Sequence, residues 1–240
     1  MISVSTIRNI IPALLSLLSA ALWGADPELK GEKKLQLSGS DTFDSRDVGA
    51  RELRLWRSSS ASYKALEIVG AANQATFRFS GKGGAIGRIS RVSNRRTVND
   101  SEVMKGSLSG LDESTGKYLW GVYGWVMDRP EWDDATVRHE IYVIHSINRA
   151  ETDPKIGTLE VGGKIYDMHR YKFSSGAYRF KAVARQPAVQ PAVVTVDIAP
   201  FLSFWKKNGL GDSRYLHEVS WAVELLTSEE HNGELTLRWE

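Results

Sequence analysis

The chain has 240 residues, of which 31 are Lys or Arg and 29 are Asp or Glu, giving a formal net charge of +2. A charge this balanced creates no global field for nucleic acid, so no nucleic-acid partner is expected. The absence of cysteine excludes disulfides, thiolate catalysis and the common structural zinc sites. The length suits one all-β domain, and burial of apolar side chains must hold it together.

The amino terminus has the pattern of an export signal. Arg8 supplies a positive region, and the apolar run at 10–22 is short for a bilayer span and ends among small residues. We therefore predict a signal peptide at 1–25, a flexible lead-in at 26–34 and a single domain at 35–240. A retained membrane anchor stays open as an alternative. Both interpretations place the domain outside the cytoplasm, and removal of the signal would leave a secreted or periplasmic protein with no membrane contact.

Short β-type segments follow, separated by clusters of Gly, Asn, Asp and Ser. This spacing of strand patterns and turn residues is typical of an all-β antiparallel sandwich or jelly roll. The predicted strands lie at 50–56, 63–69, 74–80, 85–92, 117–127, 136–147, 164–173, 177–183, 192–198, 215–226 and 234–240.

One helix interrupts these strands, in the segment DIAPFLSFWKKNG at 197–209. Pro200 suits a first helical turn, and Gly209 stands where the helix should end. Asp197 is a candidate cap. The helix is expected to pack its aromatic side, with Phe201, Phe204 and Trp205, against the outside of a sheet.

Two strands carry a carboxylate among residues that favour a buried face. In RHEIYVIHSI at 138–147, a period of two places Glu140, Tyr142 and Ile144 in one row. The other row holds Ile141, Val143 and His145. In YLHEVSWAVELL at 215–226, one row is bulky and apolar, and the other holds Glu218, Ser220, Ala222 and Glu224. Small residues beside Glu224 leave open space, which suits the floor of a cleft.

The order of several segments resembles glycoside hydrolase family 12, a family of secreted β-1,4-glucanases and xyloglucanases. The resemblance covers residues 115–240 and rests on YGWVM, HEIYVI, DPKIGTLEVGGKIYDMHRY, VTVDIAPFLSFW and YLHEVSWAVELL. It implies a β-jelly roll of two curved antiparallel sheets with an open concave cleft for a polysaccharide. It also implies retaining hydrolysis, in which Glu140 is the nucleophile and Glu224 the acid/base, about 5 to 5.5 Å apart. No cofactor and no metal are implied.

Aromatic side chains would form the sugar subsites, because sugar rings bury their apolar CH faces on aromatic rings. The candidates are Trp56, Trp120, Trp125 and Tyr142. For Trp125, as for Trp221 and Trp239, a strand row shared with apolar residues instead favours core packing. The five histidines show no metal-ligand spacing.

Departures from the family pattern leave other functions open. The family commonly has Tyr-Asp before the nucleophile strand, where the Asp supports the nucleophile, and this chain has Tyr123 and Gly124. A weakly active or purely glycan-binding domain is therefore one alternative. A less favoured one is a polysaccharide lyase for uronic-acid polymers, from RELR at 51–54, VIH at 143–145 and YKFSSGAY at 171–178. The polysaccharide and the oligomeric state are not readable from the sequence.

Overall fold

The computed structural model describes residues 32–97, 103–110, 116–131, 133, 136–189, 192–211 and 215–240. All of these residues except Glu32 belong to a compact unit that runs from Lys33 to Glu240. The predicted signal peptide and residues 26–31 of the lead-in lie outside the described residues. The first strand begins at Lys33, so the last two residues of the predicted lead-in belong to the sheet. In the described part of the chain, no helix is both long and apolar enough to cross a membrane.

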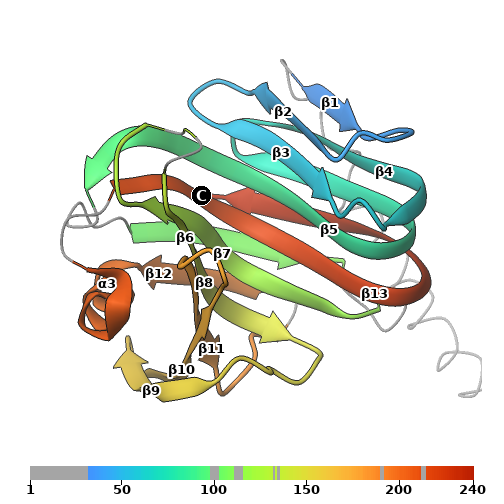
Figure 1. The fold of residues 1–240 in the computed structure, drawn as a ribbon. Helices are drawn as coiled ribbons and strands as arrows, with labels where there is room; N and C mark the ends of the chain where they lie inside the picture. The colour runs from blue at the N-terminus through green and yellow to red at the C-terminus, as the bar shows by residue number, and fades with distance from the viewer. Residues whose placement is uncertain are drawn as a thin grey trace, which may run out of the picture. The chain divides into compact units, whose positions relative to one another are not determined.

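The described residues form mostly strands, with one short helix (Figure 1). The strands are β1 Lys33–Gln36, β2 Phe43–Asp47, β3 Glu52–Arg57, β4 Ser62–Ala71, β5 Gln74–Thr97, β6 Val103–Ser109, β7 Tyr118–Met127, β8 Arg138–Ile147, β9 Lys155–Val161, β10 Lys164–Lys172, β11 Tyr178–Ala184, β12 Ala192–Asp197 and β13 Tyr215–Trp239. The sequence pattern missed β1, β2, β6 and β9, and it divided β5 and β13 into two strands each.

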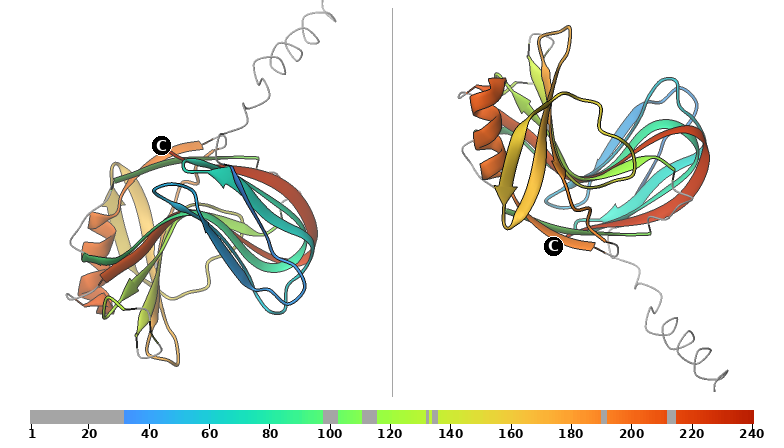
Figure 2. Two further views of the ribbon diagram at one scale, coloured as in Figure 1. Left: turned by 90° about the horizontal axis from the view of Figure 1, so that it is seen from above. Right: turned by 90° about the horizontal axis from the view of Figure 1, so that it is seen from below.

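The two long strands β5 and β13 join two layers into a β-jelly roll. The first half of each long strand pairs with different neighbouring strands from those of its second half. Both strands curve strongly (Figure 2). One layer has the order β2, β3, β5, β13, β7, β8, β11, β10, β9, and the other contains β1, β4, the remaining halves of β5 and β13, β6 and β12. The expectation of purely antiparallel sheets is wrong at one pair, because β8 and β11 are parallel. The chain passes through β9 and β10 before β11 returns to the edge of β8.

The main core lies between the layers and follows the predicted alternation. From β8 and β13, the residues Ile141, Val143, Val219, Trp221 and Val223 all point into it. The opposite rows of the same strands form a second, smaller apolar cluster that includes Tyr142, Ile144 and Ala222. The layer containing β8 and β13 therefore buries one face in the core and presents the other to a groove.

The prediction that Trp120 binds sugar is wrong. Its side chain is fully buried in the main core and stacks on Trp221 with ring centroids 5.7 Å apart. Its neighbours in the same row of β7 are the core residues Val122 and Val126. Because a strand alternates sides, Trp120 faces away from the groove and cannot form a subsite there.

The predicted helix is α3, Ala199–Trp205, and it continues into a π-helical turn, η2, Lys206–Leu210. The Ala199 N–H donates to Oδ1 of Asp197 at 3.0 Å, and Gly209 adopts a φ of 112° where the helical geometry ends. Phe201 and Trp205 enter the main core, where their rings meet Tyr166 and Phe180. The helix therefore covers the core face of the β10 and β11 end of the sheet, and the expectation that it packs against the outside of a sheet is wrong.

Candidate active site

Three adjoining cavities form a groove on the face of the sheet opposite the core. Their volumes are about 560, 420 and 430 Å³, and Trp125 lines all three. The central cavity shares Glu140 and Phe173 with one neighbour and Trp56 and Arg88 with the other. An extended groove of this size can hold several units of a linear polymer.

Glu140 and Glu224 both line the central cavity. They stand on β8 and β13, which are separated in the sheet by β7. Burial raises the pKa of Glu224 to about 7, and the negative charge of Glu140 contributes to the increase. Burial also raises the pKa of Glu140, but the charges of Arg179, Lys181 and Arg88 oppose that increase. The two carboxyl groups therefore share one cavity, in which burial raises the pKa of both and nearby positive charges oppose that increase at both.

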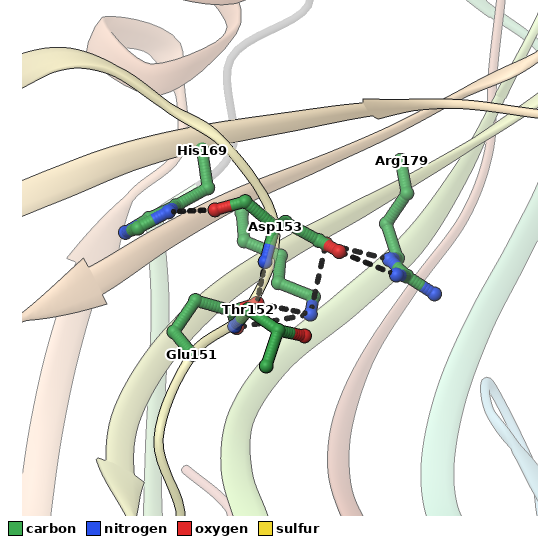
Figure 3. A network of polar contacts seen from close by, with 6 residues as sticks. Glu151, Thr152, Asp153, His169 and Arg179 are labelled. Atoms are coloured by element: carbon green, nitrogen blue, oxygen red, sulfur yellow. Dashed lines mark hydrogen bonds and ion pairs between the residues drawn. The ribbon is translucent and has the colours of Figure 1, made fainter.

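A network of polar contacts is centred on Asp153 and joins it to Glu151, His169 and Arg179 (Figure 3). Arg179 is the register neighbour of Glu140 across the β8 and β11 pair. Its Nε and Nη2 atoms donate to the two carboxylate oxygens of Asp153 at 2.8 and 2.7 Å. The buried Lys181 donates to Glu151 at 3.0 and 2.9 Å and lies 2.9 Å from Asp153. This network fixes the guanidinium of Arg179 beside Glu140.

The backbone before β9 completes this network. His169 on β10 makes a 2.7 Å hydrogen bond to the carbonyl of Asp153, and Glu151 accepts the N–H of Asp153 at 2.8 Å. Burial by itself would raise the pKa of Asp153, but its hydrogen bonds to Arg179 and Lys181 lower it. Asp153 is therefore an ionised anchor that is held in place on both its side chain and its backbone.

A second polar cluster lies under the other end of the groove. The Glu218 side chain has no solvent exposure and lies 2.8 Å from Nη1 of Arg54 and 3.2 Å from Nη1 of Arg88. The hydroxyls of Ser220 and Ser90 donate to Glu218 at 2.6 and 2.9 Å. Burial would raise the pKa of Glu218, but the two arginine charges and the serine hydrogen bonds lower it.

The remaining predicted aromatic residues face the groove. Trp56 and Tyr142 line the central cavity together with Trp125, so the core-packing interpretation of Trp125 is wrong. The core-packing interpretation is correct for Trp221 and Trp239, which are buried in the main core. Sequence reasoning missed Tyr123, which lies in the groove row of β7 with its ring edge-on to Tyr142 at 5.0 Å. It also missed Phe173, whose position after β10 carries no periodic signal.

The packing of Gly124 explains why this chain lacks the Asp that supports the nucleophile in the family pattern. A Cβ atom added to Gly124 would lie 2.4 Å from the Glu218 carbonyl oxygen and 3.2 Å from Ile141, a core residue. The position therefore points away from the groove and has no room for a side chain. Arg179 and Asp153, from elsewhere in the chain, occupy the surroundings of Glu140 instead.

The residues of the lyase alternative do not meet in the groove. His145 is buried in contact with the rings of Trp120, Trp221 and Tyr166, on the core face of β8. Burial lowers its pKa to about 3, so it stays neutral. Tyr178 stacks on His139 and packs against the main core. Among the described residues, no group of His, Asp or Glu side chains has the arrangement of a metal site.

Comparisons with known proteins support the fold. No family model and no curated protein matches the sequence. Among solved structures, the chain is similar to a family 12 xyloglucanase from Bacillus licheniformis, with a TM-score of 0.66, 13% identity and coverage of 87% of this chain and 98% of that one. The xyloglucanase domain of a type three effector from Sinorhizobium fredii, in complex with cellobiose, has a TM-score of 0.65, 13% identity and coverage of 84% and 96%.

The same fold occurs in a second family of known structures. A family 11 xylanase from Neocallimastix patriciarum has a TM-score of 0.62, 12% identity and coverage of 87% of this chain and 99% of that one. At this level of identity the likeness is one of fold. The resemblance to family 12 is thus confirmed for the architecture, and the chemistry has to be argued from the groove itself.

Proposed function

We propose that this protein is a retaining glycoside hydrolase that cleaves within a β-1,4-glucan-type polysaccharide such as cellulose, mixed-linkage glucan or xyloglucan. The observation that carries this proposal is the pair of carboxyl groups, Glu140 and Glu224, in the centre of an extended groove. The pKa of Glu224, raised to about 7 with a contribution from the charge of Glu140, supports its role as the protonated group, since retaining hydrolysis needs one ionised and one protonated carboxyl group.

In the first step, Glu140 attacks the anomeric carbon while Glu224 donates its proton to the leaving glycosidic oxygen. A pKa of about 7 leaves Glu224 protonated in mildly acidic solution. The product is a glycosyl ester on Glu140, and the ionised Glu224 then removes a proton from the attacking water. Loss of the Glu140 charge in the ester lowers the pKa of Glu224, which suits its change from acid to base.

The aromatic side chains would bind the sugar units on both sides of the scissile bond. Trp125 lines all three cavities of the groove, and Trp56 and Tyr142 line the central cavity together with Glu140 and Glu224. Such rings contact sugar faces through apolar CH groups. Their positions support several subsites in a row, as cleavage inside a chain requires.

Export is the second part of the proposal and rests on the sequence of residues 1–25. A polymer too large to enter a cell must be hydrolysed outside the cytoplasm, which fits the pattern of an export signal. Mass spectrometry of the protein from the extracellular or periplasmic fraction should give an amino terminus between residues 21 and 26. An uncleaved amino terminus would favour a retained anchor.

The activity is tested with soluble and insoluble polysaccharides, by measuring the release of reducing ends. Cellulose, mixed-linkage glucan, xyloglucan and xylan form the panel. Hydrolysis of at least one glucan is expected, together with its loss in Glu140→Gln and Glu224→Gln variants that keep the circular dichroism spectrum of the wild type. Full activity in either variant would refute the proposal. Binding without turnover by the wild type would identify a glycan-binding domain instead.

A further inference from the structure

The groove face of the sheet continues past Glu140 to strand β10. Trp125 on β7 is the register partner of Glu140 on β8, and Glu140 is the register partner of Arg179 on β11. Arg179 in turn lies opposite Tyr171 on β10. Because residues that lie opposite one another project from the same face of a sheet, these four side chains form one row across four adjacent strands. The side chain of Tyr171 therefore belongs to the groove face.

Tyr171 is one of two exposed aromatic side chains in the part of the chain that the structure describes. Tyr171 is 43% exposed, and the other, Phe43, is 47% exposed. Phe43 lines the cavity of about 430 Å³, which lies at the β3 end of the groove, whereas Tyr171 lies at the β10 end. Single exposed apolar residues are common on protein surfaces. One exposed ring at each end of the same groove is the arrangement expected if ligand contacts extend past the three cavities.

Phe173 connects Tyr171 to the groove. The Phe173 side chain lines both the central cavity and the cavity of about 560 Å³. Its ring is edge-on to the ring of Tyr171, with ring centroids 5.2 Å apart. A polymer that leaves the larger cavity past Phe173 therefore meets Tyr171 next.

Tyr171 lies beyond the sugar unit that would react. Strand β10 is two strands from β8, so about 10 Å separates the backbone of Tyr171 from that of Glu140 at a strand spacing of about 4.8 Å. The two carboxyl groups of a retaining hydrolase lie about 5 to 5.5 Å apart across a single linkage. A contact with Tyr171 would therefore be made by a unit further along the polymer.

The guanidinium group of Arg179 holds both rings in place. Its central carbon lies 5.3 Å from the centre of the Tyr171 ring and 5.5 Å from the centre of the Phe173 ring. Asp153 fixes the same guanidinium through hydrogen bonds of 2.8 and 2.7 Å. The aromatic pair is thus preorganised, which reduces the entropy that a ligand loses in ordering the side chains it contacts.

The charges beside the aromatic pair are already matched. Asp153 accepts both hydrogen bonds from Arg179, and the buried Lys181 pairs with Glu151 and Asp153. Tyr171 and Phe173 therefore present apolar ring surface beside a neutralised cation. Such surface suits the apolar CH face of a neutral pyranose ring.

We propose that Tyr171 and Phe173 form a distal subsite for a neutral pyranose unit of the polymer. The exposed ring of Tyr171 contacts the apolar face of this unit, and Phe173 separates the subsite from the cavity of about 560 Å³. The inference rests on the groove being the polysaccharide site of the proposed function. It deepens that function, because a subsite beyond the reacting unit favours long glucan chains over short oligosaccharides.

Binding at two chain lengths tests the subsite without requiring turnover. Isothermal titration in a Glu224→Gln background would measure the affinities for cellotriose and cellohexaose. Tyr171→Ala should weaken the binding of cellohexaose about tenfold, the loss expected for one aromatic contact, and that of cellotriose by less than about threefold. The short ligand can be held by the cavities around the two carboxyl groups. Tyr171→Phe keeps the ring and should bind both ligands within about threefold of the parent protein.

Ile165→Ala is the matched control. Ile165 is on the same strand and is 42% exposed, like Tyr171. It lines a separate cavity of about 140 Å³ together with Lys164 and Arg185. Because this cavity shares no lining residue with the groove, Ile165→Ala should leave both affinities unchanged.

The outcomes separate the subsite from the proposed activity. Equal losses for the two ligands in Tyr171→Ala would identify a general structural effect and overturn the subsite. Unchanged binding of cellohexaose by that variant, or no binding of cellohexaose by the parent protein, would also overturn it. A length-dependent loss in a protein that hydrolyses no polysaccharide would support the subsite and refute the hydrolase. Hydrolysis of a glucan, with cellohexaose affinity that does not depend on Tyr171, would do the reverse.

Discussion

Glu140 and Arg179 are direct neighbours across the parallel pair of β8 and β11. Two hydrogen bonds to Asp153 hold the guanidinium of Arg179 in this position. Burial raises the pKa of Glu140, and the charge of Arg179 is the largest opposing influence. The charge of Arg179 therefore favours the ionised form of Glu140 that a nucleophile needs, in a chain whose Gly124 has no space for a supporting acid.

Arg179→Gln tests this role. Removal of the positive charge should raise the pKa of Glu140, so the acidic limb of the kcat/KM profile should move to higher pH. At pH 5 we expect a loss of about tenfold in kcat/KM, and a smaller loss at pH 7. Arg185→Gln is the control, because Arg185 pairs with Asp167 at an exposed site. An unchanged acidic limb would show that Arg179 does not act on Glu140.

Glu224 should make the fold less stable as the pH rises. Its pKa increases from 4.5 in the unfolded chain to about 7 in the folded protein. Between these values the folded state binds more protons, so the stabilisation present below pH 4.5 is lost as the pH rises through about 7. Glu224→Gln, which has no charge to bury, should stabilise the protein at pH 8 by about 2 kcal/mol, or about 4 to 8 °C in Tm.

The same comparison at pH 4 provides the control. There the wild-type carboxyl group is mostly protonated in both states, and the two proteins should have similar Tm values. Thermal unfolding by circular dichroism at pH 4 and pH 8 measures both. An equal difference at the two pH values would show that burial does not perturb Glu224.

The two tryptophans of β7 should behave oppositely on substitution. Trp120→Ala removes a fully buried core side chain and should cost about 3 to 5 kcal/mol of stability. Trp125→Ala removes a groove side chain and should raise KM about tenfold with little loss of stability. Chemical denaturation and initial rates on a soluble glucan distinguish them. A large rise in KM for a folded Trp120→Phe variant would contradict the assignment of Trp120 to the core.

Much of this site was predictable from strand alternation. The rows of β8 and β13 place Glu140 and Glu224 on the face opposite Val143 and Trp221, as the sequence predicted. Strand β9, which was missed, has mixed burial and weak alternation. The parallel pairing of β11 with β8 depends on the return path through β9 and β10, which no local pattern specifies.

The sequence contains a signal that separates Trp120 from Trp125. It lies five positions before Trp125, an odd separation, so a regular strand must place the two rings on opposite faces. The charged clusters were harder to find. Arg179 and Lys181 alternate with the core residues Phe180 and Ala182, but their partner Asp153 lies in a loop with no period. Their convergence depends on tertiary packing.

Glu218 should be necessary for the stability of the groove floor. Glu218→Gln removes the negative charge between Arg54 and Arg88 and should cost about 3 to 5 kcal/mol, because the buried cations lose their partner. Glu234→Gln breaks an exposed pair with Arg78 and should cost about 0 to 1 kcal/mol. Urea unfolding of both variants measures the difference. Equal stability of the two would show that the buried cluster is not coupled to folding.

The covalent intermediate provides the most direct test of the central claim, which is that Glu140 attacks the sugar while Glu224 handles the proton. The protein would be incubated with 2,4-dinitrophenyl 2-deoxy-2-fluoro-β-cellobioside, digested and analysed by mass spectrometry. The fluorine slows hydrolysis of the intermediate, so a fluorocellobiosyl adduct should accumulate on the peptide that contains Glu140. An adduct on Glu224, or an enzyme that hydrolyses glucan yet forms no adduct on Glu140, would contradict the mechanism.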